Sequence, residues 1–268
     1  MLIDVNGHAT YCYTGGKPFN GAQPTVVFIH GVLNDHSVWI LQTRYLAHHG
    51  WNVLAVDLPG HGRSAGDAPE SVEAAASFIA AMLDAAGLAR AALVGHSWGS
   101  LIALQVASTQ PGRISHLAMV GTAFPMKVSP ALLDMSLHQP FQAIDLVNQF
   151  SHSMLAPPPS AMGPGTWLYG TSRALMRRVL ASNPAVNVFH RGFQACDSYA
   201  HGLTAMAHVR CPVLFVLGQD DQMTPPQAAH TPVSAAAHGR VLNVKAGHQL
   251  MLEAPDAVAL GLAAFLAE

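Results

Sequence analysis

The stretch Leu93–Ser100, which reads Leu-Val-Gly-His-Ser-Trp-Gly-Ser, decides how the rest of the chain is interpreted. An apolar strand is predicted over Ala91–Val94 and a helix over about 98–109, with an abrupt corner between them. Such a corner strains its central residue, and side chains two positions away on either side would collide. Gly95 and Gly99 occupy those two positions. The stretch therefore predicts a tight strand–turn–helix unit.

Ser97 is the central residue of this corner. Its hydroxyl is expected to project at the N-terminus of the helix, where the helix dipole and the free N–H groups favour developing negative charge. This is the geometry of a nucleophile elbow. Gly-x-Ser-x-Gly is short enough to occur by chance, and the alternative is a serine that only caps a helix. The strand before it and the helix after it favour the nucleophile.

Composition narrows the class of protein. The chain has 268 residues, of which 50% are hydrophobic and 10% are charged. This length and apolar content fit one large α/β domain, with or without an insertion. The formal net charge of −2 comes without a basic cluster, so nucleic acid and anionic membranes are not expected partners.

Cysteines and the N-terminus bear on the expected location. The three cysteines, Cys12, Cys196 and Cys211, are widely spaced and are interpreted as buried thiols in a reducing compartment. The first residues show no basic segment followed by an apolar run, and no apolar stretch is long enough to cross a membrane. We therefore expect a soluble cytoplasmic protein.

Strands and helices alternate along the first part of the chain. Continuous apolar runs typical of strands buried on both faces are found at 25–30, 52–57, 91–94 and 115–120. Helical segments of about a dozen residues separate them, which predicts a parallel, doubly wound sheet with right-handed crossovers. Ligand chemistry in such a sheet belongs beyond the carboxyl ends of the strands.

The alternation of strands and helices stops between residues 122 and 208. Helical segments separated by Pro- and Gly-rich joints fill this interval, and the next strand-like run begins near Cys211. We predict a core formed by residues 1–121 and 209–268, with 122–208 inserted as a helical cap over the edge of the sheet.

Four separated motifs resemble those of the α/β-hydrolase fold superfamily, in the expected order. They are Phe-Ile-His-Gly at 28–31, Asp-Leu-Pro-Gly-His-Gly-Arg-Ser at 57–64, the elbow at 95–99, and the loops Gly-Gln-Asp-Asp-Gln-Met-Thr-Pro at 218–225 and Gly-His at 247–248. The elbow also resembles locally that of proline iminopeptidases. The resemblance implies a serine hydrolase with a Ser-Asp-His triad and no cofactor.

The triad follows from the chemistry of serine and from this resemblance. A serine hydroxyl needs a base to take its proton and a carboxylate to orient that base. The resemblance assigns His248 as the base. Asp220 and Asp221 compete for the acid, and the family pattern, with the acid three residues after the glycine, selects Asp221. The oxyanion hole is expected from the backbone N–H groups of Trp98 and Val32, with Leu33 as the alternative.

The predicted substrate pocket lies in the insertion. Large apolar side chains there are candidates to line it, or else merely pack the cap onto the core: Met135, Met154, Met162, Trp167, Tyr169 and Phe193. The histidines lack the spacing of a metal site, so no metal is expected.

The sequence therefore predicts a serine hydrolase for an ester, lactone or related acyl bond of a small, fairly apolar molecule. A carbon–carbon bond hydrolase or an aminopeptidase on the same triad remains an alternative, with Asp134, Asp145 and Asp197 as the only cap acids available to hold an amine. A non-catalytic ligand-binding scaffold is the third interpretation. Oligomeric state is not predicted.

Overall fold

A computed structural model describes residues 1–153 and 166–268. Its centre is an eight-stranded sheet in the order β1-β2-β4-β3-β5-β6-β7-β8. The strands are β1 (Leu2–Val5), β2 (His8–Tyr13), β3 (Thr25–Ile29), β4 (Asn52–Val56), β5 (Ala91–His96), β6 (Ile114–Val120), β7 (Val213–Gly218) and β8 (Gly239–Val244). Pairing is parallel from β4 to β8 and antiparallel for β1 and β2. The predicted α/β fold with a mostly parallel sheet is confirmed.

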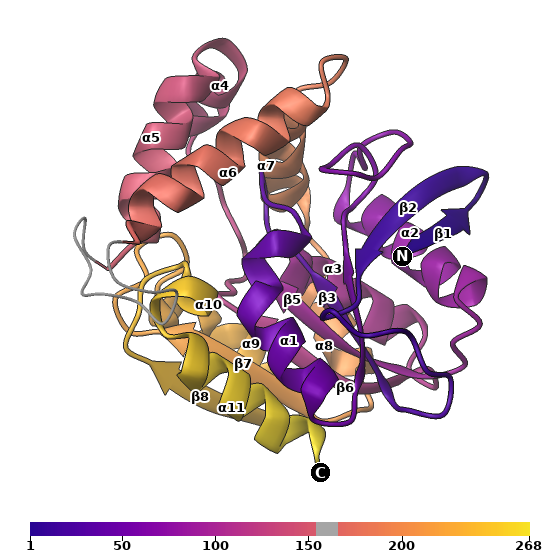
Figure 1. Ribbon diagram of the computed structural model, residues 1–268. Coiled ribbons are helices and arrows are strands. Elements are labelled where there is room, and N and C mark those ends of the chain that lie inside the picture. Colours follow the sequence, from indigo (N-terminus) through magenta and orange to yellow (C-terminus); the bar gives the residue numbers. More distant parts are fainter. Residues whose placement is uncertain (154–165) are drawn as a thin grey trace.

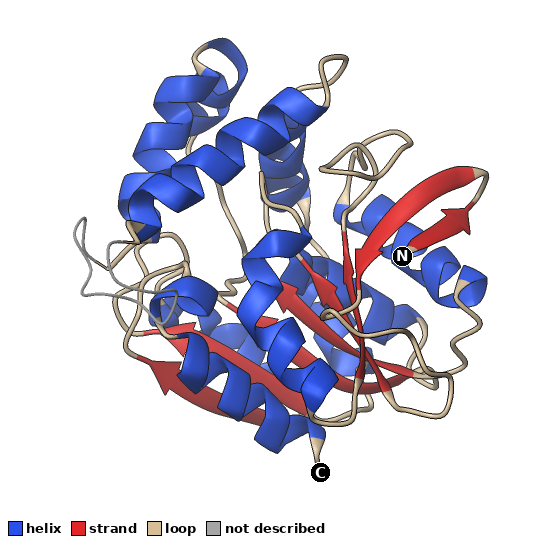
Figure 2. Ribbon diagram, in the orientation of Figure 1, coloured by secondary structure: helices blue, strands red, loops and turns tan. Residues whose placement is uncertain are grey.

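Helices cover both faces of the sheet (Figure 2). Those of the core are η1 (His36–Trp39), α1 (Ile40–His48), α2 (Val72–Ala85), α3 (Trp98–Thr109), η2 (Pro226–Ala229), α9 (His230–Ala235), α10 (Leu250–Glu253) and α11 (Pro255–Leu266). One apolar cluster includes side chains of α2 and α3, and the other includes side chains of α1 and α11. The sheet is therefore doubly wound, as predicted.

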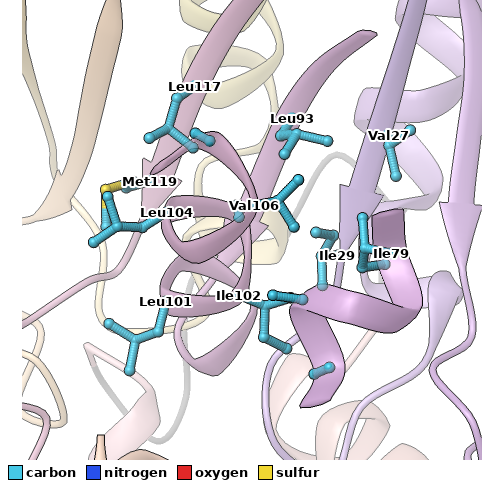
Figure 3. Close-up of a cluster of buried hydrophobic side chains, with 14 of the residues drawn as sticks. Val27, Ile29, Ile79, Leu93, Leu101, Ile102, Leu104, Val106, Leu117 and Met119 are labelled. Carbon is cyan, nitrogen blue, oxygen red and sulfur yellow. The ribbon is translucent and has the colours of Figure 1, made fainter. Parts of the chain in front are cut away.

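Alternation along the strands explains the two clusters. In β3, Val27 and Ile29 belong to the cluster on the α2–α3 side, while Val26 and Phe28 belong to the other. Figure 3 shows the first of these clusters, where strand residues face the apolar side of α3. Because both faces are buried, the strands read as continuous apolar runs rather than alternating ones.

The N-terminal hairpin was only weakly indicated by its sequence. Its two strands are joined at Asn6 and Gly7, which have φ values of 55° and 83°. Positive φ at both central residues is typical of a type I′ turn, for which Asn-Gly is a strong sequence signal.

Four helices stand together on one side of the sheet, away from the C-terminus (Figure 1). They are α4 (Pro130–His138), α5 (Pro140–Ser151), α6 (Leu168–Ser182) and α7 (Val188–Ser198). A further helix of the predicted insertion, α8 (Gly202–His208), instead packs with α3, and its Ala205 and Met206 join the α2–α3 cluster. We therefore use the term cap for α4–α7 only.

Two smaller findings concern the rest of the chain. Cys12, Cys196 and Cys211 are buried and unpaired, as expected. Within residues 1–153 and 166–268, the helices all lack the combination of length and apolar character needed to cross a membrane.

Candidate active site

The elbow has the strained geometry that its sequence predicts. Ser97 adopts φ 52° and ψ −120°, a conformation that a non-glycine residue rarely adopts. A Cβ atom on Gly95 would collide with the carbonyl oxygen of Gly99, and one on Gly99 would collide with that of Ile29. The Ser97 N–H donates to Val120 O on the neighbouring strand at 2.9 Å. Close packing of three backbone segments therefore holds Ser97 in place.

The loop after β3 passes directly beside this elbow. A Cβ on Gly31 would lie 3.2 Å from the Cβ of Ser97. Leu33, fully buried, has a φ of 57°, so the loop is strained like the elbow. Among the described residues, neither the Val32 N–H nor the Trp98 N–H is bonded to an acceptor. The N–H of Leu33, the alternative donor, is likewise without an acceptor among the described residues.

His30 fixes the start of the same loop. Its Nδ1 lies 2.8 Å from Gly31 O, and its Nε2 accepts the Leu58 N–H at 3.2 Å. The ring thus joins the loops that follow β3 and β4. Burial lowers the pKa of His30, which favours the neutral ring that this bonding pattern requires.

The acid and the histidine of the predicted triad are in contact. His248 Nδ1 lies 2.8 Å from Asp221 Oδ2. Asp221 Oδ1 accepts the N–H groups of Met223 and Thr224, both at 2.8 Å, and Thr224 Oγ1 donates to Oδ2 at 2.8 Å. Asp220, the alternative acid, is exposed at the surface. Of the two aspartates, the structure brings Asp221 to His248.

Burial and hydrogen bonding act in opposite directions on Asp221. Burial alone would raise its pKa, but the charge and hydrogen bond of His248, followed by the donors of Thr224, outweigh it and lower the pKa. The carboxylate is therefore held ionised, which is the state needed to orient the His248 ring and to stabilise an imidazolium.

His96, the residue before Ser97, also belongs to the site. Its side chain lines the same cavity as Ser97. Its Nε2 donates to the carbonyl oxygen of His248 at 2.9 Å, and the two rings lie 4.7 Å apart. Burial, then the charge of His248, lowers the pKa of His96 to about 3. A neutral His96 thus ties the elbow to the His248 loop.

Ser97 and His248 line the same small cavity. Its volume is about 30 Å³, enough to hold at least one water molecule. Its lining is Val32, Asn34, His96, Ser97, Val147, Ser151, Met176, Phe189, Phe193, Met223, His248 and Gln249. Core loops supply one side of this cavity, and α5, α6 and α7 of the cap supply the other.

The side chains predicted to line the pocket lie mostly elsewhere. Phe193 does line the cavity. Trp167 instead borders a separate groove of about 900 Å³ between η1, α1 and α6. Tyr169 packs against Trp167, with ring centroids 5.4 Å apart, and Met135 packs within the apolar cluster on the α1–α11 side. Met154 and Met162 lie outside the described residues. Neither Tyr169 nor Met135 lines the described cavity of Ser97, and both side chains pack against neighbouring residues.

Other residues line the cavity instead, and the sequence analysis did not identify them because no local sequence pattern marks them. Val147, Met176 and Phe189 occupy ordinary apolar positions of α5, α6 and α7. Which apolar residues of a cap helix face the cavity depends on how the helices are rotated over the core, and a single sequence does not reveal that. Thr224 did have a signal, since a hydroxyl three residues after an acid in a loop can turn back to it.

One cluster has side chains suited to a metal ion. Atoms of Asp35, His36 and Asp57 lie within 4.8 Å of one another. However, Asp57 Oδ1 already accepts both the N–H and the Nδ1–H of His36, each at 2.8 Å, and Asp35 Oδ2 accepts from Arg178 at 2.7 Å. The oxygens are thus engaged with hydrogen-bond donors, and we interpret the cluster as a brace between loops.

Comparison with known proteins gives a consistent assignment. A family model described as the alpha/beta hydrolase fold matches residues 24–255. A non-heme chloroperoxidase of Streptomyces lividans is 30% identical over 217 residues, which cover 75% of each chain.

Other relatives match over a smaller share of this chain. The dihydrolipoyllysine-residue acetyltransferase component of the acetoin cleaving system of Cupriavidus necator is 39% identical over 122 residues, 45% of this chain and 31% of that protein. This chain thus spans about a third of the length of the first curated relatives that it matches. The enol-lactonase of Burkholderia xenovorans LB400 superposes over 100% of both chains with a TM-score of 0.83 at 22% identity. At that identity the likeness concerns the fold.

Proposed function

Since this chain belongs to the alpha/beta hydrolase fold family, we propose that it is a serine hydrolase for an ester, lactone or related acyl bond of a small, fairly apolar molecule. One observation carries the proposal. Ser97, strained at its elbow, lines the same cavity as His248, whose Nδ1 lies 2.8 Å from the buried carboxylate of Asp221.

The proposed mechanism assigns a role to each residue of the site. Because Nδ1 of His248 faces Asp221, Nε2 is left to take the Ser97 proton as Oγ attacks the carbonyl carbon. The same nitrogen then donates that proton to the leaving group. The N–H groups of Val32 and Trp98 stabilise the oxyanion, and each such donor is worth roughly 100- to 1000-fold in rate. Water activated by His248 then releases the acid and frees Ser97.

The cavity lining supports a small, uncharged substrate. Among the described residues, no Asp, Glu, Lys or Arg lines the cavity, and apolar side chains from both the core and the cap dominate it.

The aminopeptidase alternative is weakened by the positions of the cap acids. Asp145 pairs with Arg173, at 2.5 Å, and Asp197 pairs with Lys127. Asp134 is largely exposed on α4. None of these three carboxylates lines the cavity of Ser97, so they are not positioned to hold a substrate amine there.

Ester turnover by designed variants tests the proposal. A p-nitrophenyl ester series of increasing acyl length is compared among the wild type, Ser97→Ala and His248→Ala. Loss of a triad nucleophile or base is expected to lower kcat by about 10⁴- to 10⁶-fold. Turnover that survives in Ser97→Ala at the wild-type rate would contradict the proposal. A diketone substrate in the same panel distinguishes carbon–carbon bond cleavage from ester hydrolysis.

A further inference from the structure

The backbone on both sides of His248 is hydrogen-bonded to other segments of the chain. The Gly247 N–H donates to Glu253 Oε2 at 3.2 Å, and the Gln249 N–H donates to Ser151 O at 3.0 Å. Glu253 is the last residue of α10, and Ser151 is the last residue of α5. The position of the His248 backbone therefore depends on these two helices.

The chain that leaves α5 lies directly against the loop of His248. A Cβ atom on Gly247 would lie 2.6 Å from the backbone nitrogen of Ser153 and 2.8 Å from the carbonyl carbon of His152. Two backbones can approach this closely only where one residue has no side chain. Gly247 thus brings the loop within hydrogen-bonding reach of the end of α5.

The carboxylate of Glu253 joins the two segments. Its Oε2 accepts from the Gly247 N–H and from the hydroxyl of Ser153, and the Ser153 N–H lies 3.2 Å from both of its oxygens. Among the described residues, no Lys, Arg or His forms an ion pair with Glu253. Hydrogen bonds to an ionised acceptor are roughly twice as strong as neutral ones. The carboxylate is therefore a strong bridge between the loop of His248 and the end of α5.

We propose that Glu253 is a positioning residue for the base: it holds the loop of His248 against the end of α5 and so keeps His248 beside Ser97. The proposal rests on the proposed hydrolase function and adds a residue to its machinery. Glu253 is not among the described residues that line the cavity of Ser97, so it acts through His248 and not on the substrate. A displacement of about 1 Å in a reacting group can lower a rate by roughly 100-fold.

Two esters with the same acyl group distinguish a displaced base from a general loss of active protein. p-Nitrophenolate leaves without a proton, whereas ethoxide must receive one from His248 as it departs. A displaced His248 should therefore slow acylation by ethyl butyrate more than acylation by p-nitrophenyl butyrate. We define the leaving-group ratio as kcat/KM for the p-nitrophenyl ester divided by kcat/KM for the ethyl ester. A smaller fraction of folded enzyme lowers both values equally and leaves this ratio unchanged.

Glu253→Met keeps the side-chain length and removes both oxygens. We expect kcat/KM for ethyl butyrate to fall by about 10- to 100-fold, the range for lost hydrogen bonds to a charged group. The leaving-group ratio should rise by at least about 3-fold, because proton transfer to the leaving group contributes to only one of the two reactions. Glu253→Gln should lie between the wild type and Glu253→Met, since its single oxygen can take the place of Oε2.

Two further variants assign the effect to the bridge. Ser153→Ala removes the hydroxyl that donates to Glu253 and should raise the leaving-group ratio by less than Glu253→Met does. In the double variant it should add nothing, because the carboxylate that it contacts is already absent. Glu70→Met changes an exposed glutamate and is the matched control, so its ratio should equal that of the wild type.

The fraction of chains that a fluorophosphonate labels at Ser97, measured at completion, reports how much of each variant is folded and active. This fraction should stay at the wild-type value in Glu253→Met. A lower fraction with an unchanged leaving-group ratio would mean that Glu253 only supports the fold, and would overturn the proposal. If Glu253→Met does not fold, an unchanged ratio in both Glu253→Gln and Ser153→Ala overturns it.

The wild type separates this proposal from the function on which it rests. If its hydrolysis of the two esters depends on Ser97 but the variants at Glu253 leave the ratio unchanged, the positioning role fails and the hydrolase stands. If the wild type hydrolyses neither ester and is not labelled at Ser97, the hydrolase proposal fails and the positioning role fails with it.

Discussion

The carboxyl edge of the sheet and the cap helices meet at the same cavity, but different forces hold them there. At the edge, backbone geometry fixes the elbow, because Gly95 and Gly99 leave no room for side chains. The cap is tied to the core largely through side chains, such as Arg178 to Asp35 at 2.7 Å and Asn183 Nδ2 to Gly60 O at 3.2 Å.

This difference separates the chemistry from the selectivity. The elbow of the proposed reaction lies where one extra atom is not tolerated, whereas α6 of the cap contacts the core through side chains such as Arg178. A site built in this way can change its substrate by substitution in the cap while its triad stays the same. The predictions below probe the two regions in turn.

The largest effect is expected from Gly99→Ala. The added methyl would lie 2.6 Å from His30 O and would also collide with Ile29 O, so β3 and the elbow must separate. We expect a loss of several kcal/mol in the free energy of unfolding, enough to abolish folding of a marginally stable domain. Urea unfolding measures it. Gly112→Ala, where a Cβ meets nothing within 4 Å, is the control and should change the stability little.

Asp221→Asn tests the proposed catalytic groups at the carboxyl edge of the sheet without disturbing their packing. An amide keeps the shape but favours the wrong tautomer of His248, and loss of this charge lowers kcat by about 10⁴-fold in a Ser-His-Asp triad. Asp220→Asn is the matched control, since Asp220 is exposed and its neighbour makes the contact with His248. If kcat fell more in Asp220→Asn than in Asp221→Asn, the acid of the triad would be Asp220 instead.

The pH dependence of stability tests how deeply the edge is buried. Burial, aided by the charge of His30, lowers the pKa of His61 from 6.5 to about 3. The unfolded chain therefore takes up a proton at His61 between pH 6.5 and 3 while the folded chain does not. Stability should fall as the pH drops through this window, by about 1.4 kcal/mol per pH unit for each such histidine.

His61→Gln should remove the part of this slope that His61 contributes, while the buried His96, with its pKa also near 3, retains its own. Urea unfolding at pH 7, 6 and 5 gives the slope. His138→Gln, at a largely exposed histidine, is the control for the His-to-Gln substitution itself. An unchanged slope in His61→Gln would mean that His61 is protonated in the folded protein.

The smallest effect is expected in the cap. Arg178 is mostly exposed, while Asp35 is buried and keeps its hydrogen bonds from Ser37. Burial alone would raise the pKa of Asp35, but the donors of Ser37, followed by Arg178, lower it. Arg178→Met should change kcat/KM by less than about 3-fold, because a mostly exposed partner adds little. A loss of kcat/KM as large as that in Asp221→Asn would contradict the view that the sheet edge carries the chemistry and the cap does not.

The edge could be predicted from the sequence because its requirements are local. The elbow glycines and the apolar strands follow from steric and burial rules that act over a few residues. The same holds for the helix that begins at Val72, where Ser71 accepts from the Ala74 N–H at 3.1 Å as a capping residue should.

The cap could be predicted only as helical. Its apolar residues fit equally well on a face toward the core, toward another helix or toward the cavity, so Tyr169 and Met135 were assigned to the pocket while Met176 and Phe189 form it. Such features depend on tertiary packing and leave no local pattern.

Activation of Ser97 is the central claim, and labelling with a fluorophosphonate tests it most directly. The wild-type protein is reacted with the probe, and the modified residue is located by peptide mass spectrometry. The account predicts one adduct, on Ser97, with labelling abolished in Ser97→Ala and strongly slowed in His248→Ala. A well-folded protein that is not labelled, or that is labelled equally well after Ser97→Ala, would contradict it.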